Sequence, residues 1–131
     1  MKPSMCNLAK RYFVIMVALA AVSVAYMPAA MSGGTDASFT AVEKEGTKVW
    51  EGGGTVDLKG RDSITLKVTN TLGATHGFSI DTMKVQEVID PNEERTITVP
   101  RGNIDTSVSE HRVYCQLHPK HVTATLKVTG N

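Results

Sequence analysis

Residues 38–128 are dominated by short runs in which every second residue is apolar, and this pattern limits the chain to an all-β fold. In the segment ITLKVT, for example, alternation places Ile64, Leu66 and Val68 on one face. The runs are rich in Val, Ile and Thr, which favour half-buried strands. The predicted strands are Ser38–Glu43, Lys48–Glu51, Thr55–Leu58, Ser63–Asn70, Gly77–Ile80, Val85–Ile89, Glu94–Val99, Ser107–Tyr114 and Thr123–Val128.

Clusters of Gly, Pro and Asp separate these runs and predict the turns between the strands. The clusters are Gly52–Gly54, Lys59–Asp62, Asp90–Asn92 and Pro100–Asn103. Strands this short and this closely spaced are typical of an antiparallel β-sandwich, with no helix needed between them. The fold class that we expect is therefore an all-β, Greek-key antiparallel β-sandwich.

The first 32 residues differ from the rest and predict a secretory signal peptide. Lys2, Lys10 and Arg11 precede Tyr12–Tyr26, fifteen residues without a charge, and small residues follow up to Ser32. A basic start, an apolar run and a small-residue exit are the marks of an export signal. A retained membrane anchor is the alternative, because about twenty apolar residues can span a bilayer. In both cases we expect residues 33–131 to form one domain in the periplasm or otherwise outside the cytoplasm.

The charge balance excludes some classes of protein. Lys and Arg number 14 and Asp and Glu number 13 in the whole chain. A nucleic-acid-binding protein needs a basic excess that is missing here.

Two cysteines are too few for a disulfide-rich scaffold. After residue 32 only Cys115 remains, and an unpaired thiol in an oxidising compartment needs a reason such as metal ligation.

Cys115 lies in the segment CQLHPKH, which also contains His118 and His121. The segment connects two predicted strands, so all three side chains lie on one loop. A thiolate with imidazoles suits copper and also zinc. Pro119 restricts His118 to extended conformations and helps to hold the loop in one shape. A fourth ligand must come from elsewhere in the sequence, and His76, which opens a predicted strand, is the candidate.

This arrangement resembles the cupredoxins, and among them the red copper proteins of the nitrosocyanin type. The resembling segments are Gly77–Asp81 (GFSID), Val85–Ile89 (VQEVI), Cys115–Lys120 (CQLHPK) and Thr125–Val128 (TLKV). They fall within residues 60–130, which is most of the predicted domain. The resemblance implies a cupredoxin-like fold that holds one copper ion per chain. It also implies a trimer as a possible homo-oligomer, although nothing in the composition shows one.

The ligand set that the resemblance implies is His76, Cys115, His118 and His121. Nitrosocyanin has a glutamate where this sequence has His76, the residue that most blue cupredoxins use. Its loop is also longer, so His121 matches its last histidine only across a gap of two residues. His121 falls near the position of the weak axial methionine of many cupredoxins. A stronger donor there lowers the reduction potential relative to a blue site.

The function that we expect is one-electron transfer with a redox partner protein, rather than an enzyme. His118 would present its ring edge through an apolar rim. The rim residues are Leu72, Ala74, Leu117 and Pro119. Two alternatives stay open at this point. One is a catalytic or small-ligand-binding copper site, and the other is a structural zinc or copper-buffering domain, because one Cys with three His also suits zinc.

Two further residues have simpler interpretations. His111 precedes Cys115 by four positions, about 13 Å at the rise of a strand, so we expect it to be a partly buried or edge histidine outside the site. Trp50, the only tryptophan, is predicted to pack in the core or at an edge.

Overall fold

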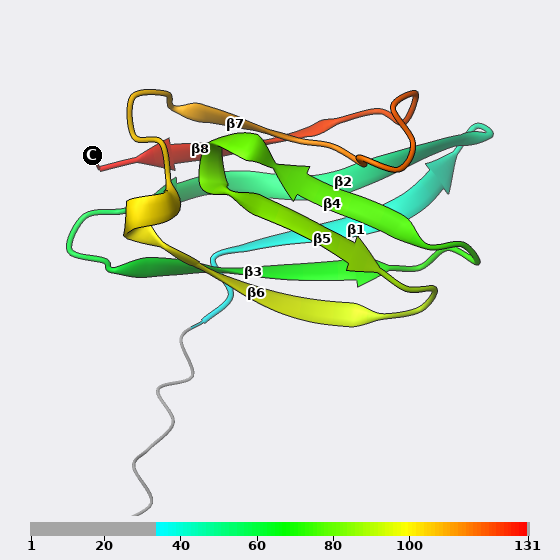
Figure 1. Ribbon diagram of the computed structural model, residues 1–131, viewed down its shortest axis with the longest axis horizontal. Coiled ribbons are helices and arrows are strands. Elements are labelled where there is room, and N and C mark those ends of the chain that lie inside the picture. Colours follow the sequence, from blue (N-terminus) through cyan, green and yellow to red (C-terminus); the bar gives the residue numbers. More distant parts are fainter. Residues whose placement is uncertain (1–33, 131) are drawn as a thin grey trace, which may run out of the picture. The chain divides into compact units, whose positions relative to one another are not determined.

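The computed structural model describes residues 34–130, which form eight strands and two short 3₁₀ turns (Figure 1). The predicted signal segment, residues 1–32, lies outside the described residues. In chain order the elements are β1 (Ala37–Lys44), β2 (Thr47–Asp57), β3 (Ser63–Asn70), β4 (His76–Ile80), η1 (Asp81–Met83), β5 (Val85–Ile89), β6 (Glu94–Pro100), η2 (Arg101–Asn103), β7 (Glu110–Val113) and β8 (Ala124–Thr129). No helix among the described residues has the length and apolar character needed to cross a membrane.

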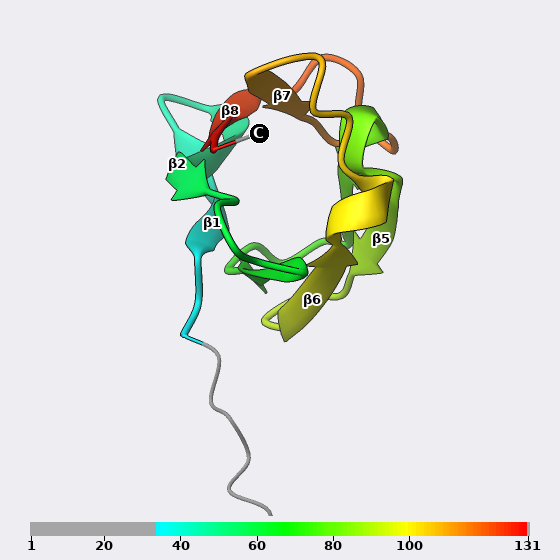
Figure 2. The same cartoon turned by 90° about the vertical axis from the view of Figure 1, so that its left-hand side faces the viewer.

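The strands form a six-stranded sheet in the order β6-β3-β1-β2-β8-β7 and a two-stranded sheet of β4 and β5. Viewed along the strands, the ribbons form a ring around the core (Figure 2). The all-β prediction is confirmed. The large sheet is mixed, however, because β1 pairs with β3 and β2 pairs with β8 in parallel. Both parallel pairs join strands that are not consecutive in the chain, which alternation alone does not reveal.

The turn predicted at Gly52–Gly54 is wrong, because these glycines lie inside the eleven-residue strand β2. Their φ angles are 112°, 106° and 122°, a region that L side chains rarely adopt. A Cβ at Gly52 would overlap the carbonyl oxygen of Ser38 on β1, and one at Gly53 would lie 2.6 Å from the carbonyl oxygen of Thr125. Here β2 changes its partner from β1 to β8. The glycines permit this change of partner, which we call the strand crossing, and the chain does not reverse its direction.

Most other predicted strands agree with the structure within one or two residues. The exception is Ser107–Tyr114, of which only Glu110–Val113 is β-strand. The residues before it form turns, in which Asp105 accepts hydrogen bonds from the backbone and hydroxyl of Ser107. Such local bonds compete with pairing to a neighbouring strand.

The core fills the space between the two sheets. The rings of Phe39 and Trp50 contact that of Phe78, with centroids 5.2 and 5.1 Å apart, so β1 and β2 are packed against β4. Complete burial of a side chain such as Phe78 contributes about 1.5–3 kcal/mol. All five residues of β4 are buried, which makes this strand a rigid support for His76 at its first position.

Candidate metal centre

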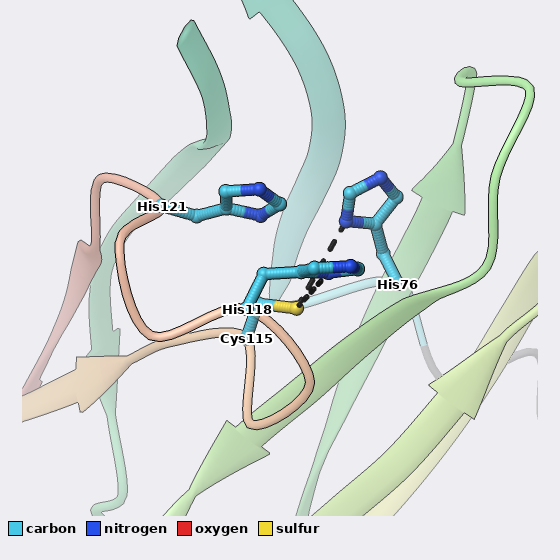
Figure 3. Close-up of side chains that lie close together, drawn as sticks. All are labelled: His76, Cys115, His118 and His121. Carbon is cyan, nitrogen blue, oxygen red and sulfur yellow. Dashed lines mark hydrogen bonds between the residues drawn. The ribbon is translucent and has the colours of Figure 1, made fainter.

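Four side chains converge at one end of the strands: His76, Cys115, His118 and His121 (Figure 3). Each offers one donor atom, and the four atoms lie within 4.8 Å of one another. Three come from the loop between β7 and β8, and His76 comes from β4. The structure therefore brings together all four residues that the sequence predicts as ligands.

The loop from Cys115 to His121 is folded by two successive turns. The backbone N–H of His118 donates to the carbonyl oxygen of Cys115 over 3.2 Å, and that of His121 donates to the carbonyl oxygen of His118 over 3.1 Å. Each of these hydrogen bonds joins residue i to residue i+3 and closes a β-turn. The two turns place three donors of seven consecutive residues on the same side, which an extended segment could not do.

The two sheets together form a barrel around the core, and both ends of the loop are attached to it. Before Cys115, the backbones of Tyr114 and Ser79 exchange hydrogen bonds of 2.9 and 3.0 Å. After His121, the N–H of Val122 donates to the carbonyl oxygen of Lys48 on β2. The loop is therefore connected at its start to β4 and at its end to β2.

His76 is positioned by the connection that precedes it. Asn70, at the end of β3 and fully buried, donates from its amide to the carbonyl oxygens of Ala74 and Ile89 at 2.8 and 3.0 Å. Its own side-chain oxygen accepts from the N–H of Leu72. One asparagine thus closes the loop before His76 and joins it to β5. The sequence pattern does not predict this role, although an Asn at the end of a strand is a turn signal.

The separations of the sulfur from two of the imidazole nitrogens suit a single ion. The Sγ atom of Cys115 lies 3.9 Å from Nδ1 of His76 and 3.4 Å from Nδ1 of His118. Donors bound to one ion at about 2.3 Å for sulfur and 2.0 Å for nitrogen, in tetrahedral or flatter geometry, lie roughly 3.4–3.9 Å apart. The rings of His118 and His121 are stacked, with centroids 4.5 Å apart.

The surroundings of His76 and His121 favour the neutral form of these two imidazoles. Burial, followed by the proximity of His121, His118 and Lys48, lowers the pKa of His76 below its ordinary value. The pKa of His121 is lowered by burial, His118 and Lys48. A metal ion requires imidazole in its neutral form. The cluster thus already disfavours the protons that would compete with an ion.

His76 also lacks a partner that a buried ring needs. Only 2% of the residue is exposed, and its Nε2 has no hydrogen-bond partner among the described residues. Its Nδ1 has only the sulfur at 3.9 Å. Buried polar atoms are nearly always hydrogen-bonded. An ion shared with the sulfur would satisfy Nδ1, whose only contact is the long one to Sγ, so the residues present fit a metal of the copper or zinc class.

A second set of contacts surrounds the sulfur. The backbone N–H of Gly77 donates to Sγ of Cys115 over 3.2 Å. The carbonyl oxygen of the same glycine accepts from Nε1 of Trp50 over 3.0 Å. Trp50 is a core residue, as predicted, and it also fixes the peptide next to His76. Sequence spacing gives no signal for this contact, because 27 positions separate the two residues.

Solvent can reach the cluster from one side. A cavity of about 370 Å³ lies between the end of β7 and the loop. Its lining comprises Arg112, Tyr114, Cys115, Gln116, His118, Pro119 and His121. His118 itself is exposed, whereas His76 and Cys115 are buried. The centre is thus enclosed by the barrel on one side and open to small molecules on the other.

His111 lies outside the cluster, as the sequence analysis predicts. It is fully buried rather than partly so, and its Nδ1 shares a 2.7 Å hydrogen bond with the hydroxyl of Thr82. Of the predicted rim, Ala74, Leu117 and Pro119 are exposed, but Leu72 is half-buried against the core. Val122, which is not part of the predicted rim, is 53% exposed and follows His121 in the chain.

Comparison with known proteins supports the fold. The sequence matches no protein-family model and no curated protein. The structure is similar to that of a laccase from Pediococcus acidilactici Pa5930, with 15% identity, a TM-score of 0.51 and coverage of 72% of this chain. It is also similar to CueO, a laccase-like multi-copper oxidase from Ochrobactrum sp., with 17% identity, a TM-score of 0.50 and the same coverage.

This chain spans about a quarter of the length of those oxidases, 26% and 27% respectively. The similarity therefore concerns the fold of one domain: residues 34–130 have a cupredoxin-like fold. Together with the cluster of one cysteine and three histidines, this fold confirms the coarser part of the resemblance seen in the sequence.

Proposed function

We propose that this protein binds one copper ion through His76, Cys115, His118 and His121 and transfers single electrons. The observation that carries the proposal is the convergence of one thiol and three imidazoles from two distant parts of the chain. Copper bound there would supply a one-electron Cu(II)/Cu(I) couple. The four residues would hold the ion, and the two turns of the loop would limit how far the donors move between oxidation states.

The surface around His118 supports transfer to a protein partner. Leu117 is 47% exposed and Val122 is 53% exposed, and Pro119 lies between them in the chain. A hollow of about 390 Å³ covers the same loop, from Leu117 to His121. A small apolar patch next to an exposed imidazole suits brief docking of a redox partner. The partner protein, like export to the periplasm through residues 1–32, is part of this proposal.

The finer resemblance to nitrosocyanin is also a proposal. It rests on the segments Gly77–Asp81, Val85–Ile89 and Cys115–Lys120. An imidazole at position 76 replaces the glutamate of that type, so the spectrum of this protein should differ from a red one. A trimer, suggested by the same resemblance, belongs to this finer proposal.

Binding of a small ligand is a second candidate function, and the cavity beside Cys115 favours it. This space of about 370 Å³ borders His118 and His121 and is large enough for a small anion or gas molecule. The guanidinium of Arg112 lies at its edge, over the ring of Tyr114 at 5.3 Å. The described lining residues include no carboxylate to act as a base, so we rank electron transfer first.

The test is the absorption and electron paramagnetic resonance spectrum of residues 33–131 loaded with one Cu(II). We expect an intense thiolate-to-copper band that is lost in Cys115→Ser. A change of this band on addition of azide would favour the small-ligand function instead. A matched control is His111→Gln, which removes a histidine outside the cluster and should keep the band.

Metal preference separates the proposal from a structural or metal-buffering domain. If the protein remains colourless with Cu(II) and binds Zn(II) tightly, the redox function is wrong. If Cu(II) gives the band and is displaced slowly or not at all by zinc, the copper assignment stands. The same titration in His76→Ala shows whether the buried histidine contributes to binding.

A further inference from the structure

The side chain of Gln116 lies across the outer side of β4, directly after the proposed ligand Cys115. Its Oε1 accepts a hydrogen bond from the hydroxyl of Ser79 over 2.8 Å. Its Nε2 donates to the backbone carbonyl oxygen of Glu87 on β5 over 2.9 Å. We call these two hydrogen bonds the Gln116 bridge. They use both ends of one amide and join the ligand loop to both strands of the small sheet.

The bridge depends on Gly77. A Cβ at this position would overlap Oε1 and Cδ of Gln116 and would lie 2.8 Å from its Nε2. Gly77 has no positive φ angle, so its backbone conformation does not demand glycine. Glycine leaves free the space that the amide of Gln116 occupies, so a side chain at position 77 would have to displace this amide, the far end of a flexible side chain.

The same glycine contacts the proposed ligand. Its N–H donates to Sγ of Cys115 over 3.2 Å. Gln116 therefore contacts Gly77 from outside while it is covalently joined to Cys115. The backbone pairing of Ser79 with Tyr114 attaches the residue before Cys115 to the same strand, β4. The residue before Cys115 and the residue after it are thus both attached to β4, which fixes the N–H···S contact between them.

We propose that Gln116 is a positioning residue that holds Cys115 Sγ against the N–H of Gly77 and thereby tunes the copper–thiolate bond. This inference rests on the proposed copper function. Hydrogen bonds to a ligating sulfur withdraw electron density from it and are a principal means of adjusting a metal's reduction potential. Loss of the bridge loosens this contact, returns electron density to the sulfur and favours Cu(II) over Cu(I).

The test compares Gln116→Met with Gln86→Met. Methionine keeps the length of glutamine but forms neither hydrogen bond. Gln86 is the only other glutamine, and it is exposed on β5 opposite Ser79. For Gln116→Met we expect the thiolate-to-copper band to shift and the ratio of Cu(I) to Cu(II) affinity to fall about tenfold, the lower end of the loss of metal affinity that follows removal of a contact to a ligand. Gln86→Met should match the parent in both.

A second measurement needs no metal. In the metal-free protein, amide exchange of the Gly77 N–H and alkylation of Cys115 by iodoacetamide should both accelerate in Gln116→Met and not in Gln86→Met. Unchanged exchange and alkylation would overturn the inference, whether or not copper binds. If the parent binds no copper, the proposed function fails, and these two rates alone decide whether Gln116 positions Cys115.

A double-mutant cycle separates positioning from general destabilisation. Gly77→Ala should displace Gln116 and shift the band as Gln116→Ala does. The double variant should then shift the band no further than Gln116→Ala does, because the new methyl group enters the vacated space. Fully additive effects on the band would contradict a shared role. Should Gly77→Ala fail to fold, Ser79→Ala removes one bond of the bridge and should give a smaller shift in the same direction.

Discussion

Trp50 and Gly77 are joined by a hydrogen bond from indole Nε1 to carbonyl oxygen over 3.0 Å, within the core and 27 positions apart in sequence. Trp50→Phe keeps an aromatic ring against Phe78 but leaves the Gly77 carbonyl without this donor. A buried acceptor left unpaired costs about 1–3 kcal/mol. We expect a loss of this size in the free energy of unfolding, measured by urea denaturation followed by circular dichroism. Val88→Ala, at a 44% exposed position, should stay within about 0.5 kcal/mol of the parent.

The strand crossing in β2 predicts unequal effects of two similar substitutions. Gly52 and Gly54 both have positive φ angles, but only a Cβ at Gly52 meets other atoms. Gly54→Ala should cost about 1–3 kcal/mol from backbone strain alone. Gly52→Ala should cost clearly more, because it also forces β1 away at Ser38. Equal losses in urea denaturation would mean that the close approach at Ser38 relaxes freely.

His111 predicts a dependence of stability on pH. Burial, opposed by Asp105 and a backbone contact with Val108, lowers the pKa of His111 below its ordinary value. As the pH falls below about 6.5, the unfolded chain takes up a proton that the folded protein refuses. The free energy of unfolding therefore falls with pH in this range, by at most about 1.4 kcal/mol per unit for one group, and is unaffected by His111 at higher pH.

The measurement is urea denaturation of the metal-free protein between pH 7.5 and pH 5. His111→Gln should flatten the slope below pH 6.5, whatever its effect on stability at neutral pH. The lowered pKa values of His76 and His121 contribute slopes of the same sign, so the difference between parent and variant is the quantity to compare. An identical slope in both proteins would show that the pKa of His111 is the same in the folded and the unfolded protein, and the prediction would be wrong.

The proposed copper site predicts that a substitution of His121 changes its reduction potential. His121 is the least buried of the three histidines with a lowered pKa, and its ring stacks on that of His118. His121→Met exchanges a strong nitrogen donor for a weak thioether and should favour Cu(I). We expect a potential higher by at least about 59 mV, a tenfold change for one electron, in protein-film voltammetry. No change in potential or spectrum would show that His121 does not bind the ion.

The proposed electron-transfer function predicts that a change at Leu117 alters the kinetics with a redox partner and not the proposed copper site. Leu117→Asp places a charge on the exposed loop next to His118 while leaving the four donors intact. The rate of electron exchange with a redox partner should fall about tenfold or more, and the spectrum should stay the same. Val108→Asp introduces the same charge at another exposed apolar residue and should leave the rate unchanged. Equal slowing by both would indicate a general charge effect.

The alternating pattern predicted most of the strands, because each residue's apolar or polar character shows directly which face of a strand it occupies. Ser63–Asn70 and Val85–Ile89 are strands with the predicted bounds. The error at Gly52–Gly54 has a physical cause: three glycines favour a turn and a tight strand crossing equally, and only the carbonyl oxygens of Ser38 and Thr125 distinguish them. Parallel pairing was also beyond prediction, since alternation describes a strand's faces and not its neighbours.

The grouping of the four donors was predictable because three of them are close in sequence and the fourth opens a strand. The surroundings of the donors were not. Asn70, Trp50 and Gln116 act on the site through backbone atoms of Ile89, Gly77 and Glu87, which carry no sequence signal of their own. Residue types indicate which chemistry is available, whereas the contacts that orient it come from the register of distant strands.

Three of the four donors lie within seven consecutive residues, on a connection that crosses from β7 to β8. The barrel supplies only His76 and the groups that hold the ends of this connection. A short insertion, deletion or exchange between Cys115 and His121 could therefore replace most of the donor set and leave every core residue in place. The donor set and the fold are thus carried by different parts of the sequence, so changes in the loop can alter what this domain binds without altering its core.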